Sequence, residues 1–143
     1  LPDLDLSQTL DPFDAIPAAN QGILAVQIRT DRDDLAQVFT NLTDEATRAA
    51  FWAERACLAT LGADCRSALG IYAQVTYDRE LGAATETRSL CVHALVMEPS
   101  GSERIRLSLS GSLDTPGQLG QQLAAALLDA GAAVWIGTPP HLL

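Results

Sequence analysis

The sequence predicts an α+β fold in which a three-stranded antiparallel sheet carries helices packed on one face. Two helical apolar patterns come after residue 30, three strand-like segments follow, and a last helical pattern completes the order. Hydrophobic residues make up 48% of the 143 residues and charged residues 19%, so the chain has enough apolar side chains for a core.

The two helices before the sheet are predicted from Asp31 to Leu42 and from Thr43 to Gly62. Asp31 and Thr43 have side-chain oxygens that can cap the first backbone N–H groups of a helix, and Gly62 suits a helix end. The apolar positions of the second helix are mostly small, which indicates close packing against a neighbour: Ala46, Ala49, Ala50, Ala53, Cys57 and Leu61.

Three strands are predicted after these helices. Apolar and polar residues alternate over 71–77 and 104–110, and residues 90–97 are apolar on both faces apart from one histidine. The segment 98–102 contains proline and glycine and predicts a turn, so the last two strands should pair antiparallel.

The last helix has the clearest local signals in the chain. Thr115 and Gln118 match a capping box, Pro116 fits the first helical position, and Gly131 follows the last apolar position. Packed on one face of the sheet, this helix and the earlier ones would bury their apolar stripes together.

The first thirty residues follow a different pattern. Residues 1–20 contain three prolines and scattered acidic residues, which predicts a loop. Residues 23–28 are nearly all apolar and partly β-branched, which is typical of an interior strand covered on both faces. Such a strand needs neighbours. Without them we expect either self-association through residues 23–28 or poor order of this segment.

The charge balance excludes several classes of function. Eighteen acidic residues face nine arginines and no lysine, for a net charge of −9, so Schiff-base chemistry and a phosphate-loop lysine are excluded. An acidic chain does not favour a nucleic-acid surface, and no apolar run reaches the roughly 18 residues of a membrane span. Three widely spaced cysteines form neither a disulfide framework nor a zinc pattern, which predicts a reducing cytoplasm and no metal site.

Cys65 lies in the predicted loop after the second helix, between Asp64 and Arg66. The arginine favours the thiolate and the aspartate opposes it, so the local charges nearly cancel. Taken alone, an exposed loop cysteine is more often incidental than functional. Cys57 and Cys91 fall on apolar patterns, where core packing is expected.

Five other residues have local interpretations beside functional ones. Gln21 and Gly22 precede the apolar segment and suit either a turn or a ligand-binding loop. Arg29 and Arg32 can bind a carboxylate ligand, but the aspartates beside them favour surface pairing. His93, in an apolar strand, is expected to be buried or half-buried and hydrogen-bonded. The residues alone therefore predict an α+β domain with one loop cysteine.

Two segments, in this order, resemble the porphobilinogen deaminase (hydroxymethylbilane synthase) family. Residues 16–29 resemble the stretch P-A-x-G-Q-G-x-x-x-I-E-x-R, and residues 53–70 resemble E-R-x-x-L-x-x-L-x-G-G-C-x-x-P-x-G. The resemblance covers roughly residues 14–137. It implies that residues 1–30 end the family's N-terminal domain with a strand, and that residues 31–143 form its C-terminal cofactor-attachment domain.

The resemblance also implies a function. The family's enzyme, a transferase of tetrapyrrole, porphyrin and heme biosynthesis, condenses four porphobilinogen molecules into hydroxymethylbilane with loss of ammonia. Cys65 corresponds to the cysteine that carries the dipyrromethane cofactor through a thioether, and Gln21 and Gly22 correspond to a segment lining the cleft. The family's catalytic aspartate and anion-binding arginines belong to earlier domains. We therefore expect no catalytic residue in this chain, no activity from it alone, and the N-terminal domains of the same protein as its partners.

The chain differs from the family pattern at several positions. Ala63 and Asp64 replace the Gly-Gly before the cysteine, Ala68 replaces the proline after it, and Asn20 replaces a glycine. These differences support a second interpretation, in which the chain is a non-enzymatic binding or assembly domain of the same fold. A third interpretation is a thiol-dependent enzyme or sensor that uses unmodified Cys65.

Overall fold

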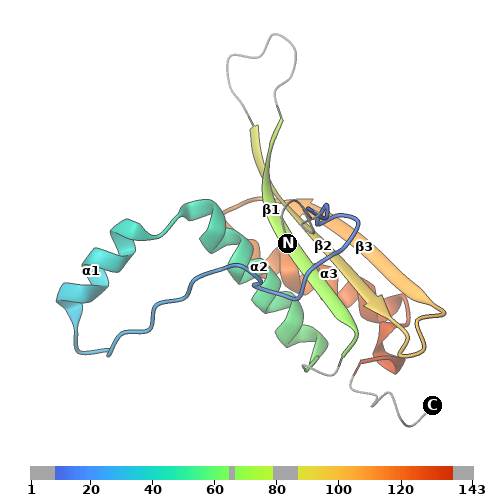
Figure 1. Ribbon diagram of the computed structural model, residues 1–143. Helices are drawn as coiled ribbons and strands as arrows, with labels where there is room; N and C mark the ends of the chain where they lie inside the picture. Colours follow the sequence, from blue (N-terminus) through green and yellow to red (C-terminus); the bar gives the residue numbers. More distant parts are fainter. Residues whose placement is uncertain (1–8, 65–66, 79–86, 137–143) are drawn as a thin grey trace, which may run out of the picture.

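The computed structural model describes residues 9–64, 67–78 and 87–136 (Figure 1). The three strands form one antiparallel sheet in the order β1-β2-β3, which confirms the predicted α+β fold. The helices α2 and α3 pack on one face of this sheet, α2 against β1 and α3 against β3. The elements are α1 (Asp33–Leu42), α2 (Glu45–Leu61), β1 (Leu69–Asp78), β2 (Thr87–Met97), β3 (Arg104–Gly111), α3 (Pro116–Asp129) and the short 3-10 helix η1 (Ala132–Val134).

The core lies between the sheet and the helices α2 and α3. Alternate residues of β2 point toward the helices and are buried, whereas the residues between them face the other side of the sheet. The largest fully buried side chains come from all these elements: Ile71, Leu90, Val92, Val96, Cys57, Leu123 and Leu127.

The helices α2 and α3 approach closely where α3 has Gly120. A Cβ atom built on Gly120 would overlap the carbonyl oxygen of Ala53 and would lie 3.0 Å from the backbone nitrogen of Cys57. Ala53 and Cys57 are themselves fully buried. The small residues of α2 therefore pack against a neighbouring helix, as the sequence predicts.

The predicted helix caps are partly wrong. Asp31 does not cap α1, because its carboxylate pairs with the guanidinium of Arg29 at 2.5 Å. Asp44, not Thr43, caps α2, and its side chain accepts a hydrogen bond from the Thr47 nitrogen at 2.7 Å. The hydroxyl of Thr43 instead donates to the carbonyl of Phe39 in the preceding turn.

The end of α2 and the start of α3 agree better with the prediction from the sequence. Gly62 ends α2 in the left-handed conformation with φ 64°, and Pro116 is the first residue of α3. Thr115 stands at the N-cap of α3, but among the described residues its side chain makes no capping hydrogen bond. The capping-box prediction is therefore correct in position and wrong in its hydrogen bond.

The predicted strand at residues 23–28 does not form within the described part of the chain. This segment makes no sheet hydrogen bonds there, and the side chains of Leu24 and Val26 are 95% and 61% exposed. The helix α1 follows it, has no buried residue, and lies away from the sheet (Figure 1). A strand needs backbone partners, and the three strands of this sheet do not supply them.

We predict that Gly120→Ala lowers the free energy of unfolding by at least about 2 kcal/mol, because the new methyl group has to push α3 away from the backbone of α2. Urea unfolding followed by tryptophan fluorescence measures this change.

Gly117→Ala is the matched control, because a Cβ on Gly117 meets no atom within 4 Å and the position lies in the same helix. This variant should raise stability by up to about 1 kcal/mol, since alanine favours the helix over glycine. Equal effects of the two substitutions would contradict the close contact between α2 and α3.

Candidate functional site

Residues 11–21, here called the strap, wrap around the free edge of β1 (Figure 1). Phe13 lies on the sheet face opposite the helices, with its ring centroid 4.6 Å from that of His93. The carbonyl of Pro17 then accepts a hydrogen bond from the Ile71 nitrogen at 2.9 Å, at the edge itself. Beyond this point the strap reaches α2, so it contacts both sides of the sheet.

Gly70 explains how the strap comes so close to β1. A Cβ atom built on Gly70 would lie only 2.5 Å from the carbonyl oxygen of Ile16, closer than a real Cβ contact allows. Gly70 is also the last residue of the second segment that resembles the porphobilinogen deaminase family. A glycine is needed there because the backbone of the strap passes directly over it.

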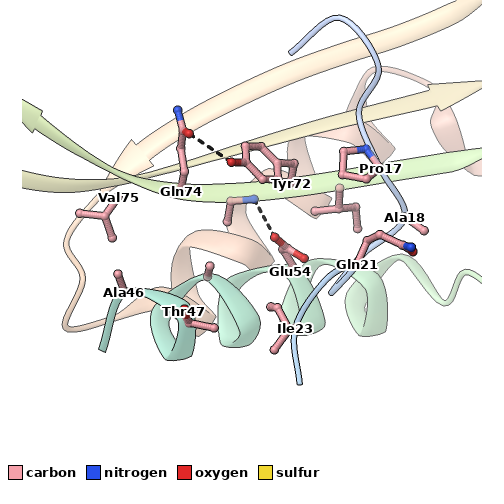
Figure 2. Close-up of a pocket in the computed structure, with 13 residues that line it drawn as sticks. Pro17, Ala18, Gln21, Ile23, Ala46, Thr47, Glu54, Tyr72, Gln74 and Val75 are labelled. Carbon is pink, nitrogen blue, oxygen red and sulfur yellow. Dashed lines mark hydrogen bonds between the residues drawn. The ribbon is translucent and has the colours of Figure 1, made fainter. Parts of the chain in front are cut away.

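Glu54 joins the strap, α2 and β1 through one buried carboxylate. Its side chain extends from α2 toward the backbone of β1 (Figure 2) and is only 4% exposed. The carboxylate accepts a hydrogen bond from the Ala73 nitrogen at 2.7 Å and another from the Asn20 nitrogen at 2.5 Å. Both donors are backbone groups, the Ala73 nitrogen at the free edge of the sheet and the Asn20 nitrogen in the strap, and a buried backbone N–H needs such a partner.

Burial raises the pKa of the Glu54 carboxyl, while the hydrogen bonds from Asn20 and Ala73 act in the opposite direction. Burial is the larger cause, because the charged form loses its hydration inside the protein. The folded chain therefore holds a proton on Glu54 more tightly than an unfolded chain does.

Asn20 adopts the left-handed conformation with φ 62°, the only non-glycine residue with positive φ among those described. Gly22 follows with φ 81°, so Gln21 sits between two left-handed residues in a tight turn. Asparagine tolerates this conformation better than most residues, which explains how it can stand where the family pattern has glycine. The side-chain oxygen of Asn20 is buried and has no hydrogen-bond partner among the described residues.

An open pocket of about 240 Å³ lies between the end of the strap, α2 and β1 (Figure 2). Its polar lining includes the side chains of Gln21, Thr47, Glu54, Tyr72 and Gln74. These groups can donate and accept hydrogen bonds, but no arginine or histidine is among the residues that line the pocket. The pocket therefore suits a neutral polar group better than an anionic one.

The structure places only part of the predicted cofactor site. Gln21 lines the pocket, whereas Gly22 is exposed beside it and serves the turn. Cys65 lies outside the described residues. Among the described residues near it, the Ser67 nitrogen donates a hydrogen bond to the carbonyl of Asp64 at 3.1 Å. The structure thus brings Gln21 together with Glu54, and the position of Cys65 relative to them is not tested.

The predicted surface pairing of Arg29 and Arg32 is confirmed. Arg29 pairs with Asp31 at 2.5 Å and Arg32 with Asp34 at 2.6 Å, all four on exposed positions. Each arginine holds the pKa of its aspartate partner below the usual range. These arginines are therefore engaged by neighbouring side chains in the described structure.

Two of the three interpretations of buried polar residues are confirmed. Cys57 is fully buried, and burial, together with the charge of Glu54, raises the pKa of its thiol to about 12. His93 is half-buried, with its Nδ1 atom 2.6 Å from the hydroxyl of Ser108. The prediction of core packing for Cys91 is wrong. This residue lies on the sheet face opposite the helices, because its neighbours in β2 take the inward positions.

Sequence reasoning assigned no role to Glu54, although a signal was present. Glu54 follows Ala50 by four residues and precedes Cys57 by three, so it lies on the small-residue face of α2 that packs inward. A carboxylate on a buried helix face requires hydrogen-bond donors from a neighbouring element.

Metal and membrane signals are absent from the described ranges. Within them, no three or more His, Cys, Asp or Glu side chains gather in an arrangement able to hold a metal ion. The helices of these ranges are also too short or too polar to span a membrane.

We predict that Glu54→Gln removes a pH-dependent part of the stability. Because the folded pKa of Glu54 lies above its ordinary value of 4.5, this part is fully present below pH 4.5 and is lost as pH rises through the raised pKa. The difference in unfolding free energy between the parent chain and the variant should therefore be greatest in acid and should shrink toward neutral pH.

Urea unfolding at a series of pH values measures this difference, and exposed Glu103→Gln is the control for the loss of a carboxylate at the surface. A difference that grows as pH rises would contradict the role of burial.

We also predict that two substitutions of Asn20 differ in their effect on stability. Asn20→Gly should change the unfolding free energy by no more than about 0.5 kcal/mol, because glycine adopts positive φ freely. Asn20→Val should lower it by about 2 kcal/mol, because a β-branched residue is strained in this conformation. Thermal unfolding of both variants checks the prediction, and equal losses would argue against the left-handed turn.

Comparison with known proteins gives a consistent result. The family model described as porphobilinogen deaminase, C-terminal domain, matches residues 49–129, more than half of the chain. Curated porphobilinogen deaminases are similar over nearly all of it. The protein of Acidothermus cellulolyticus is 39% identical over 139 residues, that of Mycobacteroides abscessus 41% over 136, and that of Mycobacterium tuberculosis 42% over 131.

These matches cover 94%, 92% and 90% of the chain but only 39%, 43% and 41% of the respective relatives. The chain thus spans about two fifths of the length of these curated relatives. The family match includes most of α2 with Glu54, the three strands and the whole of α3. On this match, and on an α+β fold of the expected element order, the chain belongs to the porphobilinogen deaminase C-terminal domain family.

Proposed function

We propose that this chain is the C-terminal portion of a porphobilinogen deaminase, a transferase that joins four porphobilinogen molecules into hydroxymethylbilane in the cytoplasm. The observation that carries the proposal is the family match over residues 49–129. The identity to the Acidothermus cellulolyticus relative covers 94% of the chain and therefore extends well before α2. The strap and residues 23–28 are thus included in the likeness.

We assign residues 1–30 to the end of the N-terminal domain and residues 31–143 to the cofactor-attachment domain. The exposure of Leu24 and Val26 supports this division, because an extended apolar segment without sheet partners needs a sheet elsewhere. Val38 and Leu42 of α1 are also exposed, at 51% and 73%. In this proposal the remaining domains of the same protein cover these side chains. Self-association of the chain covers the side chains only when those domains are missing.

We assign Cys65 as the residue that holds dipyrromethane through a thioether bond, with Gln21 and Gly22 nearby in the cofactor-binding segment. The cofactor would serve as the covalent primer of the condensation. A thioether needs a thiol that is open to a bulky group, and the exposure of Asp64, next to Cys65 in the sequence, supports this assignment.

In this proposal the chain attaches and positions the cofactor, and other domains of the protein carry out proton transfer. Condensation with loss of ammonia needs an acid for the departing amine and cations for the anionic substrate side chains. Arg29 and Arg32 are paired with their own aspartates, and the pocket beside Glu54 is lined by no arginine. We therefore infer that the substrate porphobilinogen is held mainly by the N-terminal domains.

A non-enzymatic binding or assembly domain of the same fold is the second candidate. The observation that favours it is Asp64, whose carboxylate accepts from the hydroxyl of Ser67 at 3.5 Å in a turn where the family pattern has Gly-Gly. A carboxylate beside Cys65 repels the anionic side chains of the cofactor. The two candidates differ in whether Cys65 becomes modified.

We predict that the isolated chain forms no hydroxymethylbilane from porphobilinogen, because in this proposal the groups for proton transfer and anion binding belong to the N-terminal domains. We also predict that co-production with the two N-terminal domains of the Acidothermus cellulolyticus relative adds the mass of one dipyrromethane to this chain. Assay of the product and intact-mass spectrometry measure the two outcomes.

Cys65→Ser should abolish the added mass, whereas the matched control Cys91→Ser should retain it. Hydroxymethylbilane formed by the isolated chain would contradict the first expectation. An unmodified mass from a stable complex with the partner domains would favour the assembly domain.

A further inference from the structure

A cysteine, a histidine and two serines form a hydrogen-bonded row on the sheet face opposite the helices. The Cys91 sulfur lies 3.2 Å from Nε2 of His93, and Nδ1 of the same ring lies 2.6 Å from the hydroxyl of Ser108. The hydroxyl of Ser110 donates to the Cys91 sulfur at 3.3 Å. These four side chains come from β2 and β3 and do not line the pocket beside Glu54.

Either neutral tautomer of His93 satisfies all three contacts. In the tautomer with its proton on Nδ1, Ser110 donates to the sulfur, the Cys91 S–H donates to Nε2 of His93, and the Nδ1–H of His93 donates to Ser108. In this arrangement the imidazole is neutral and its free nitrogen faces the thiol. A thiol that can pass its proton to a fixed imidazole is more nucleophilic than an isolated thiol.

The surroundings of His93 keep the ring in place and neutral. Phe13 of the strap packs edge-to-face on the ring, and its carbonyl accepts a hydrogen bond from the side chain of Arg106. Burial and, to a smaller extent, the charge of Arg106 lower the pKa of His93. A neutral imidazole is the form that accepts a proton.

Cys57 provides a contrast within the same chain. Its side chain is fully buried between α2 and α3, whereas Cys91 is half-buried on the other side of the sheet with a base beside it. The two thiols therefore differ in both access and proton acceptor.

We propose that Cys91 is a nucleophilic thiol that forms mixed disulfides with small disulfide molecules, and that His93 accepts its proton. The Cys91 sulfur attacks one sulfur of the small disulfide, a new S–S bond forms, and the original S–S bond breaks. The leaving thiolate takes the electron pair and then the proton held on His93. Cys91 is oxidised to the mixed disulfide, and half of the small disulfide is reduced to a thiol.

The test uses the 143-residue chain with Cys65→Ser, so that only Cys57 and Cys91 remain. Dithiodipyridine is the probe, because it is an uncharged disulfide whose leaving group absorbs light. We expect one equivalent to react rapidly, and peptide mapping to place it on Cys91. The rate for Cys91 should exceed by at least about tenfold its rate in the same chain unfolded in urea.

His93→Gln should lower the Cys91 rate by about tenfold or more, since it removes the proton acceptor. Ser108→Ala keeps the imidazole but removes its orienting partner, and should lower the rate by a smaller factor. Exposed Ser112→Ala is the matched control and should leave the rate unchanged. Far-ultraviolet circular dichroism confirms that each variant is folded.

The proposal is overturned if folded Cys91 reacts no faster than unfolded Cys91, or if folded His93→Gln and the parent react at the same rate. It is independent of the proposed function, because the readout does not involve Cys65, dipyrromethane or porphobilinogen.

Discussion

The buried carboxylate of Glu54 is the contact on which the arrangement of the strap and β1 depends. It accepts backbone hydrogen bonds from Asn20 and Ala73, while Pro17 occupies the neighbouring edge donor on Ile71. A sheet edge normally exposes such donors to any other strand. Here a side chain of α2 and the strap occupy two of them, so part of the β1 edge is closed without a fourth strand.

The two faces of the sheet have different chemistry, and the alternation of β2 produces this difference. The inward residues, such as Leu90 and Val92, pack on helices that meet closely at Gly120. The outward residues Cys91 and His93 meet hydroxyl groups of β3 and the ring of Phe13. The core is therefore tightly packed on one face of the sheet, while the opposite face of the same rigid sheet holds the polar and nucleophilic side chains.

Periodicity made most of the fold predictable. The first and third strands, α2 with its small inward residues and the final helix each repeat with a clear period, which tertiary packing then preserves. The orientation of Cys91 was not predictable, because residues 90–97 are apolar on both faces and the pattern does not fix which face points inward. The caps predicted at Asp31 and Thr43 are each one residue too early, because α1 begins after Arg32 and the side chain of Asp44 caps α2.

The candidate site was less predictable than the fold. Gln21 was identified through a family resemblance, and the structure places it beside Glu54, which no motif rule had assigned. A single carboxylate among small residues becomes informative only once its backbone partners, 19 and 34 residues away, are known. The strand predicted at 23–28 does not form in the described part of the chain, because β1, β2 and β3 offer this segment no backbone partners.

The path of the strap has a mechanical consequence. Residues 23–28 continue directly into the turn of Asn20 and Gly22, and the strap then runs past Pro17 to Phe13. A pull on residues 23–28 is therefore carried first by the hydrogen bond between Asn20 and Glu54, then by the one between Ile71 and Pro17, and last by the aromatic contact of Phe13 with His93. The strap acts as a tether with three successive anchors, which lie on the helix side of the sheet, at its edge and on its opposite face.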